Sequence, residues 1–183
     1  ENTLSIKYWS DLLNLINETP KDTYNKLYLD ILNEYDFLIN NWPSDLPRGI
    51  IHGDLFPDNI FFQNNKLTGV IDFYFACDEF YIFDIAICIN AWCFESDNSF
   101  NITKASHLLK GYKSLKNLTE DEVQFLPIMC RGSALRFLLT RLLDWNKRDE
   151  NVLVTPKDPS EYYNKLQFHQ SVTSSTDYGI YDK

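Results

Sequence analysis

The chain has 183 residues and 44% of them are hydrophobic, so it can bury a substantial core and does not have a disordered composition. Its formal net charge of −9 argues against binding to the phosphate backbone of nucleic acids, which requires a basic surface. The most apolar run, Tyr81 to Trp92, is shorter than the ~20 residues that cross a bilayer, so we expect no membrane segment.

The cysteines indicate a cytoplasmic protein with reduced thiols. They form no Cys-x-x-Cys pair and most lie in apolar runs: Cys77, Cys88, Cys93 and Cys130. The histidines have no metal-ligand spacing to the cysteines, which argues against a zinc site.

Two helices are predicted before the first strand. The first covers Ser10 to Asn17 and ends by Pro20, and Thr23 caps the second. Apolar residues recur at three- and four-residue spacing along the second helix, which predicts one buried face: Leu27, Tyr28, Ile31, Leu32, Tyr35, Leu38 and Ile39. Pro43 and Pro47 stop this helix.

The period changes to that of strands between Gly49 and Phe73, and Asn64-Asn65-Lys66 between two apolar runs predicts a hairpin turn. A loop over Tyr74 to Glu79 follows. A buried helix is then expected from about Phe80 to Phe94.

The rest of the chain is predicted to be helical. After a polar loop at Glu95–Asn101, a helix runs from Thr103 to about Leu115. The Thr119–Glu122 stretch is a capping box, and it opens a helix that Pro127 is expected to kink. The core face of a next helix is marked by Leu135, Leu138, Leu139 and Leu142. A last helix starts at Asp158-Pro159-Ser160-Glu161, and Ser171–Lys183 is expected to be loosely held.

The strand-rich segment carries the polar residues that suggest chemistry. Asp54 and Asn59 lie in a loop between two strands, and the strand after the hairpin ends on Asp72. Phosphoryl transfer needs a positioned nucleophile and metal ions that neutralise the polyphosphate. Asp54 suits the base that takes the proton of an attacking hydroxyl, and the oxygens of Asn59 and Asp72 suit Mg²⁺.

Each of these residues also has a structural explanation. Asp54 or Asn59 alone could simply form a turn. His52 is more plausible as a support that hydrogen-bonds the loop backbone than as a catalyst. Asp84 either accepts hydrogen bonds from the loop or caps the N-terminus of its own helix.

Substrate contacts are less sharply indicated. Asp58 could line the acceptor pocket or only shape the turn. Arg131, Arg136 and Arg141 are candidates to bind a substrate carboxylate, although their five-residue spacing does not place them on one helical face.

The loop His52-Gly53-Asp54-Leu55-Phe56-Pro57-Asp58-Asn59 resembles the catalytic loop of the aminoglycoside phosphotransferase and choline kinase superfamily. Longer stretches are similar to the kinase-fold homoserine kinases: Ile71–Cys77, Phe83–Glu95, Leu135–Leu142 and Pro156–Tyr162. The resemblance covers nearly the whole chain.

The resemblance implies an α+β, mostly helical, kinase-like C-terminal lobe over residues 1–183, with a small β-hairpin carrying the catalytic loop. It implies ATP-dependent phosphorylation of the hydroxyl of L-homoserine, with Asp54 as the base and Asn59 and Asp72 as Mg²⁺ ligands. No glycine-rich loop or lysine-bearing strand is recognisable. The N-terminal lobe is therefore expected to be absent and could be a separate partner.

Two other functions stay open. The lobe could phosphorylate another small alcohol, such as an amino alcohol or an aminoglycoside, for which an acidic pocket would be expected. It could also be a catalytically inactive remnant or a binding module.

Overall fold

The structure is a computed structural model that describes residues 2, 5–17, 25–146 and 156–181. The α-helices of these residues are α1 (Trp9–Asn17), α2 (Asn25–Asn41), α3 (Tyr81–Trp92), α4 (Ile102–Lys113), α5 (Glu120–Asn146) and α6 (Ser160–Ser171). The strands are β1 (Arg48–Ile51), β2 (Ile60–Gln63), β3 (Lys66–Val70) and β4 (Cys77–Phe80). Short 3-10 helices cover Ile6–Tyr8, Pro57–Asn59, Phe73–Phe75 and Ser175–Tyr178.

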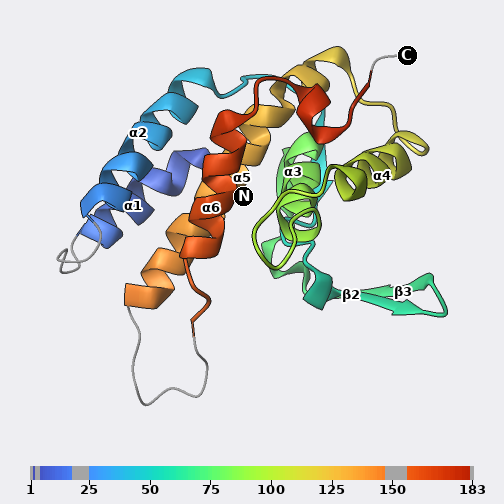
Figure 1. The fold of residues 1–183 in the computed structure, drawn as a ribbon, viewed down its shortest axis with the longest axis horizontal. Coiled ribbons are helices and arrows are strands. Elements are labelled where there is room, and N and C mark those ends of the chain that lie inside the picture. The colour runs from blue at the N-terminus through green and yellow to red at the C-terminus, as the bar shows by residue number, and fades with distance from the viewer. Residues whose placement is uncertain (1, 3–4, 18–24, 147–155, 182–183) are drawn as a thin grey trace.

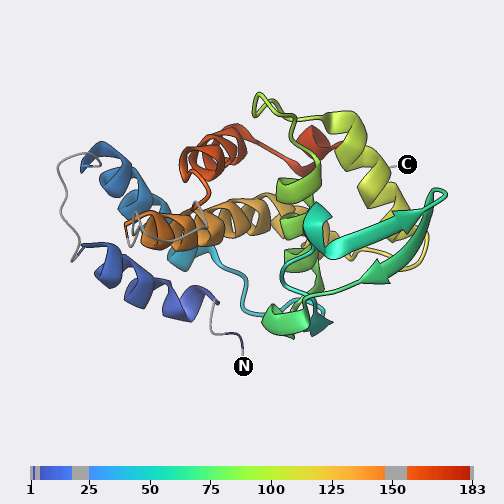
Figure 2. The same ribbon diagram turned by 90° about the horizontal axis from the view of Figure 1, so that it is seen from below.

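The long helix α5 is the central element of the fold. It packs against α1 and α2 on one side, α6 on another, and α3 at its N-terminal half (Figure 1). The β2–β3 hairpin extends away from the helices, on the side of α3 and α4 (Figures 1 and 2). The fold is thus α+β and mostly helical, as the sequence predicted.

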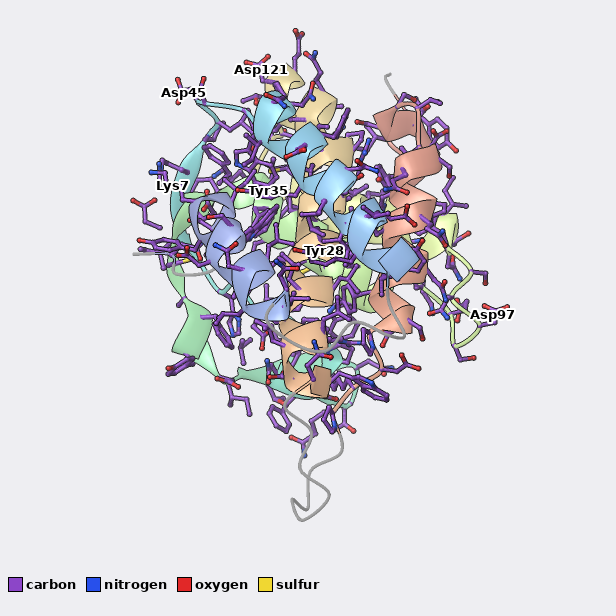
Figure 3. All side chains as sticks on the ribbon, turned by 90° about the vertical axis from the view of Figure 1, so that its left-hand side faces the viewer. Lys7, Tyr28, Tyr35, Asp45, Asp97 and Asp121 are labelled. Carbon is purple, nitrogen blue, oxygen red and sulfur yellow. The ribbon has the colours of Figure 1, made fainter. Side chains whose placement is uncertain are left out.

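The face of α2 is predicted correctly except at one position. Ile31 and Leu38 are buried, whereas Ile39 is 46% exposed and lies outside the apolar face. Figure 3 looks onto α1 and α2, with Tyr28 and Tyr35 labelled on α2, where both pack against the neighbouring core. Pro20 and Thr23, which were expected to end α1 and cap α2, lie outside the described residues.

The segment after Thr119 forms one helix, where the sequence suggested two. The capping box is present: Glu122 Oε2 accepts from the Thr119 amide at 2.8 Å, and Thr119 Oγ1 accepts from the Glu122 amide at 3.1 Å. The helix then continues through Pro127 to Asn146. Packing of α5 against several helices outweighs the ~3 kcal/mol that an internal proline costs.

The strands form two antiparallel pairs. The expected hairpin is confirmed, and Asn64 and Asn65 turn the chain with φ values of 52° and 59°. The expected loop over Tyr74–Glu79 is wrong in its second half, because Cys77 to Phe80 form β4, which pairs with β1 from Ile51↔Cys77 to Arg48↔Phe80.

The expectation that residues 171–183 are loosely held is wrong for most of them. Ser175, Tyr178 and Ile180 are buried, and the Tyr178 hydroxyl lies 2.8 Å from Nδ1 of the buried His169. A capping box between Ser174 and Asp177 fixes the intervening turn. Burial of Tyr178 and Ile180 against the core therefore holds the C-terminal segment.

The four cysteines are free thiols, and three of them are buried. None of the helices in the described part of the chain combines the length and the apolar character that crossing a bilayer requires.

Candidate active site

The polar loop begins where β1 ends, at a glycine that the backbone requires. Gly53 has φ = 77°, in the left-handed region that favours glycine. A Cβ at this position would lie 2.7 Å from the carbonyl oxygen of Phe75. The loop therefore packs directly on the backbone that follows Asp72, and only glycine permits this close approach.

Two side chains from helices hold the backbone of this loop. Asp84 of α3 accepts hydrogen bonds from the amides of His52, at 3.1 Å to Oδ2, and of Gly53, at 3.0 Å to Oδ1. Arg136 of α5 donates from Nη1 to the carbonyl oxygen of Gly53 at 2.7 Å. Burial raises the pKa of Asp84, and the two amide hydrogen bonds oppose that rise.

His52 connects the loop to the segment that carries Asp72. Its Nδ1 accepts from the Asp54 amide at 3.3 Å, and its Nε2 lies 3.0 Å from the carbonyl oxygen of Ile71. These partners are both satisfied by the neutral ring with the proton on Nε2. The ring also packs against Phe73 at a centroid distance of 4.6 Å. His52 thus touches the backbones of both segments.

Asp54 is half-buried and bound to Asn59. Nδ2 of Asn59 donates to the main-chain oxygen of Asp54 at 2.9 Å and to its carboxylate Oδ2 at 3.1 Å. Burial raises the pKa of Asp54, while the charge of Arg136 and the hydrogen bond from Asn59 lower it. A raised pKa brings a carboxylate closer to the range in which a general base works well.

The β2–β3 hairpin returns the chain so that Asp72 lies near Asn59. Ile60 pairs with Val70, and the Ile71 amide donates to the Asn59 carbonyl oxygen at 3.0 Å. Asp72 itself has φ = 62°, a conformation that is uncommon for residues other than glycine and concentrates at functional sites. The next turn, Phe73–Phe75, starts directly from this residue.

These side chains meet in one small open cleft of about 190 Å³. It is lined by Asp54, Phe56, Asp58, Asn59, Asp72, Phe137, Arg141 and Lys157. Asp54, Asp58 and Asp72 form the acidic floor of the cleft. Arg141 of α5 and Lys157 of the segment before α6 form its cationic wall.

The side-chain oxygen atoms of Asn59 and Asp72 in this cleft fit a hard divalent cation. Both polar hydrogens of Asn59 point to Asp54, which leaves its Oδ1 as a free acceptor among the described contacts, and Asp72 is exposed beside it. Within the described residues no group of three or more His, Cys, Asp or Glu side chains could hold a metal. A cation here would therefore need further oxygen ligands from water or nucleotide phosphates, as Mg²⁺ usually does.

The structure brings only one of the three candidate arginines to the cleft. Arg131 forms a bidentate pair with Glu34, at 2.6 Å for each bond, and lies over the Phe37 ring. Arg136 is 4% exposed and lies beneath the loop, bound to Gly53. Arg141 lines the cleft, as does the exposed Asp58.

Sequence reasoning missed two residues at the site. Trp92 of α3 donates from Nε1 to the Leu55 carbonyl oxygen at 2.7 Å, and Lys157 lies 3.7 Å from Asp58 across the cleft. Nothing in local spacing indicates the contact of Trp92, which depends on how α3 packs under the loop. Lys157 belongs to the Pro156–Tyr162 stretch, whose resemblance to known sequences was the available signal.

The fold is similar to that of a solved kinase. The structure superposes on amicoumacin kinase hAmiN, solved with AMP-PNP, Ca²⁺ and amicoumacin, with a TM-score of 0.59. The two sequences are 18% identical, and the match covers 89% of this chain and 48% of that one. The kinase-like fold expected from the sequence is confirmed.

Curated proteins with much higher identity confirm the resemblance to homoserine kinases. The chain is 50% identical over 179 residues to the homoserine kinase of Sinorhizobium medicae, covering 98% of this chain and 55% of the relative. It is 49% identical to that of Rhizobium meliloti and 48% identical to that of Rhodospirillum rubrum, with 98% of this chain covered in both cases. The chain spans about half the length of these relatives.

A protein-family model described as the phosphotransferase enzyme family matches residues 4–118, which include the whole loop from His52 to Asn59 as well as Asp72 and Asp84. The chain therefore belongs to the phosphotransferase enzyme family.

Proposed function

We propose that this chain carries the catalytic loop of a cytoplasmic homoserine kinase, which transfers the γ-phosphoryl group of ATP to the hydroxyl of L-homoserine, a step towards threonine. One observation carries the proposal: Asp54, Asn59 and Asp72 share a small cleft with Arg141 and Lys157. The first three suit phosphoryl transfer, and the two cations suit an acceptor that has a carboxylate. The homoserine kinases that are about 50% identical in sequence to this chain support the choice of acceptor.

In the proposed reaction Asp54 orients the acceptor hydroxyl and takes its proton. The hydroxyl oxygen forms a bond to the γ-phosphorus while the bond from that phosphorus to the β–γ bridging oxygen breaks, and ADP leaves with the electron pair. Asn59 and Asp72 would hold the divalent cation, which we take to be Mg²⁺, and that ion neutralises charge on the polyphosphate when bound.

The loop contacts give the remaining side chains positioning roles in this proposal. Asp84, Arg136 and His52 bind the backbone on either side of Asp54. Holding the base in place lowers the entropic cost of reaching the reactive geometry. None of the three is expected to touch the reacting atoms.

The cleft argues against an aminoglycoside acceptor. An aminoglycoside is a polycationic ligand of several rings and needs a pocket with acidic walls. Pockets for ligands of that size usually have volumes of ~300–1,000 Å³. This cleft of about 190 Å³ carries Arg141 and Lys157 on its wall. These two cations suit the carboxylate of an amino acid, a group that an aminoglycoside lacks.

The test is Asp54→Asn, in the protein as its gene encodes it, assayed for ADP release and phosphohomoserine formation. Loss of the general base should lower kcat by about 10²–10⁴-fold, with a smaller change in the KM for ATP. The matched control is Asp45→Asn, an exposed aspartate in the connection before β1, which should leave kcat unchanged (Figure 3). Near-normal turnover by Asp54→Asn would exclude Asp54 as the base.

A further inference from the structure

The wall of the cleft opposite the acidic floor is built from α5 and the segment before α6. We propose that Arg141, assisted by Lys157, binds the carboxylate of the acceptor and thereby sets the specificity for an amino acid. This inference rests on the proposed function, because it names the group that distinguishes homoserine from other small alcohols. Arg141 is the main candidate for this role, because its contacts fix the guanidinium beside the cleft.

The guanidinium of Arg141 is held in a fixed orientation. Its Nη1 donates to Glu161 Oε2 at 2.6 Å and to the Asp158 carbonyl oxygen at 3.2 Å. Its plane lies over the Tyr162 ring, with Cζ 4.3 Å from the centroid. Only 10% of the side chain is exposed. An arginine fixed in this way has already lost the rotamer freedom that ligand binding would otherwise restrict.

This fixed arginine keeps unused donors. Both of its hydrogen bonds to described residues come from Nη1. Among the described residues, Nε and Nη2 therefore have no hydrogen-bond partner. A guanidinium has five N–H donors in a planar fork, and a carboxylate accepts two of them side by side. The remaining edge of Arg141 in the cleft is therefore suited to a bidentate carboxylate contact.

The charges around Arg141 leave a positive excess. Lys165 is buried, and its Nζ lies 2.6 Å from Oε1 of the same Glu161 that pairs with Arg141. Two cations therefore share one carboxylate. The positive excess is confined to this wall of the cleft, opposite Asp54, Asp58 and Asp72, and there it favours an anionic ligand group, which would be partly shielded from water and so screened less than at an open surface.

Lys157 and Asp58 complete a pattern that suits a zwitterion. They face each other across the cleft at 3.7 Å, with side chains that are 64% and 81% exposed. A loose surface pair of this kind contributes little on its own and can separate easily. In the bound state Lys157 would add a second cation for the carboxylate, and Asp58 would face the ammonium group.

The test compares L-homoserine with 3-amino-1-propanol, called propanolamine below, which has the same amine and hydroxyl but lacks the carboxylate. The measured quantity is the ratio of kcat/KM for the two acceptors, in the protein as its gene encodes it. In Arg141→Met this ratio should fall by about 30- to 100-fold, since a charge-assisted bidentate contact is lost. The loss should be mainly in the KM for homoserine, and Arg141→Lys should recover part of it.

Two further variants distinguish the loss of a carboxylate contact from a folding defect in Arg141→Met. Lys157→Ala changes an exposed side chain, and we expect the ratio to fall by about 3- to 10-fold with an unchanged thermal midpoint. Arg48→Ala is the matched arginine control, because Arg48 is exposed and pairs with Asp78 outside the cleft. It should leave the ratio at its wild-type value.

The outcomes separate this inference from the proposed function. If the wild type prefers homoserine and both Arg141→Met and Lys157→Ala keep that preference, Arg141 and Lys157 do not recognise the carboxylate. If the wild type phosphorylates propanolamine as well as homoserine, or acts only on other alcohols, the proposed acceptor is wrong and this inference fails with it.

Discussion

The residue that shapes the candidate site most directly is Gly53. Its φ of 77° and its close approach to the Phe75 carbonyl oxygen allow Asp84 and Arg136 to bind the backbone before Asp54. A side chain here would push the loop away from the segment that carries Asp72. The Gly53–Phe75 contact therefore helps to set the mutual position of Asp54 and Asp72, together with the contacts of His52 and Asn59 to the backbone of Ile71.

This dependence predicts a large effect of Gly53→Ala. The left-handed conformation costs a non-glycine residue ~1–2 kcal/mol, and the added Cβ clashes with backbone that cannot easily move. We expect a lower thermal midpoint and a kcat reduced by at least about tenfold, because the loop shifts.

Gly111→Ala is the control for that substitution. Gly111 lies in α4, and a Cβ there would meet no atom within 4 Å. This variant should raise stability by ~0.5–1 kcal/mol, since alanine favours a helix interior over glycine. Equal effects of the two substitutions would contradict the role assigned to the Gly53 backbone.

At the scale of elements, α3, α5 and α6 connect the site to the C-terminal segment through buried polar contacts. Nε2 of His169 lies 3.1 Å from Oδ1 of Asn90, and the Asn90 carbonyl oxygen accepts from Lys165 at 2.9 Å. Because Asn90 donates both its side-chain hydrogens to main-chain oxygens, its Oδ1 accepts from His169, which is therefore protonated on Nε2. The ring of His169 is neutral and accepts from Tyr178 on Nδ1.

Buried His169 predicts a loss of stability in acid. Burial, together with the charges of Lys165 and Arg131, lowers its pKa to about 3. The unfolded chain, with a histidine pKa of ~6.5, binds more protons between these values. The free energy of unfolding should therefore be largest above about pH 6.5, where His169 is neutral in both states. It should decrease as the pH falls towards about 3, because the unfolded chain takes up the proton first.

The variant His169→Gln removes this titration. Its unfolding midpoint in urea should be lower at about pH 7, because buried hydrogen bonds are lost, but should fall less steeply towards about pH 4. His107→Gln, at an exposed position of α4, should keep the wild-type slope. An unchanged slope in His169→Gln would show that other groups cause the acid sensitivity.

The sequence predicts most elements here but few of their contacts. The hairpin is readable because Asn64-Asn65 suits a turn with positive φ, and α3 is readable because its residues are apolar except for Asp84 and Asn90. The strand β4 is not, since Cys77-Asp78-Glu79-Phe80 has little strand propensity and is fixed by pairing with β1. The division of this segment after Thr119 into two helices fails for a similar reason, because helix packing outweighs a local preference.

The candidate site shows the same division. Asp54, Asn59 and Asp72 are recognisable from their order along the chain, and the cleft contains all three. Spacing on α5 could not tell which arginine reaches it, because that depends on the partners: Glu34 from α2 binds Arg131, and the Gly53 carbonyl binds Arg136. Trp92 and Lys157 act through contacts between distant segments, which no local pattern reports.

At the scale of the whole molecule, the cleft lies where the loop after β1, the hairpin end and α5 meet, and its acidic floor faces a cationic wall. Elsewhere the acidic side chains that produce the net charge of −9 are spread over the outside, as Asp45, Asp97 and Asp121 illustrate (Figure 3). An anionic acceptor group is therefore attracted by the local charges of Arg141, Lys157 and Lys165 rather than by the charge of the whole protein.

The most direct test of the central claim is the acceptor preference of the protein as its gene encodes it, with ATP and Mg²⁺. The kcat/KM for L-homoserine, followed by ADP release and by phosphorus NMR of the product, should exceed the values for propanolamine, choline and an aminoglycoside by at least about 100-fold. Phosphorylation of the aminoglycoside or of choline with a kcat/KM equal to or above that for homoserine would contradict the account.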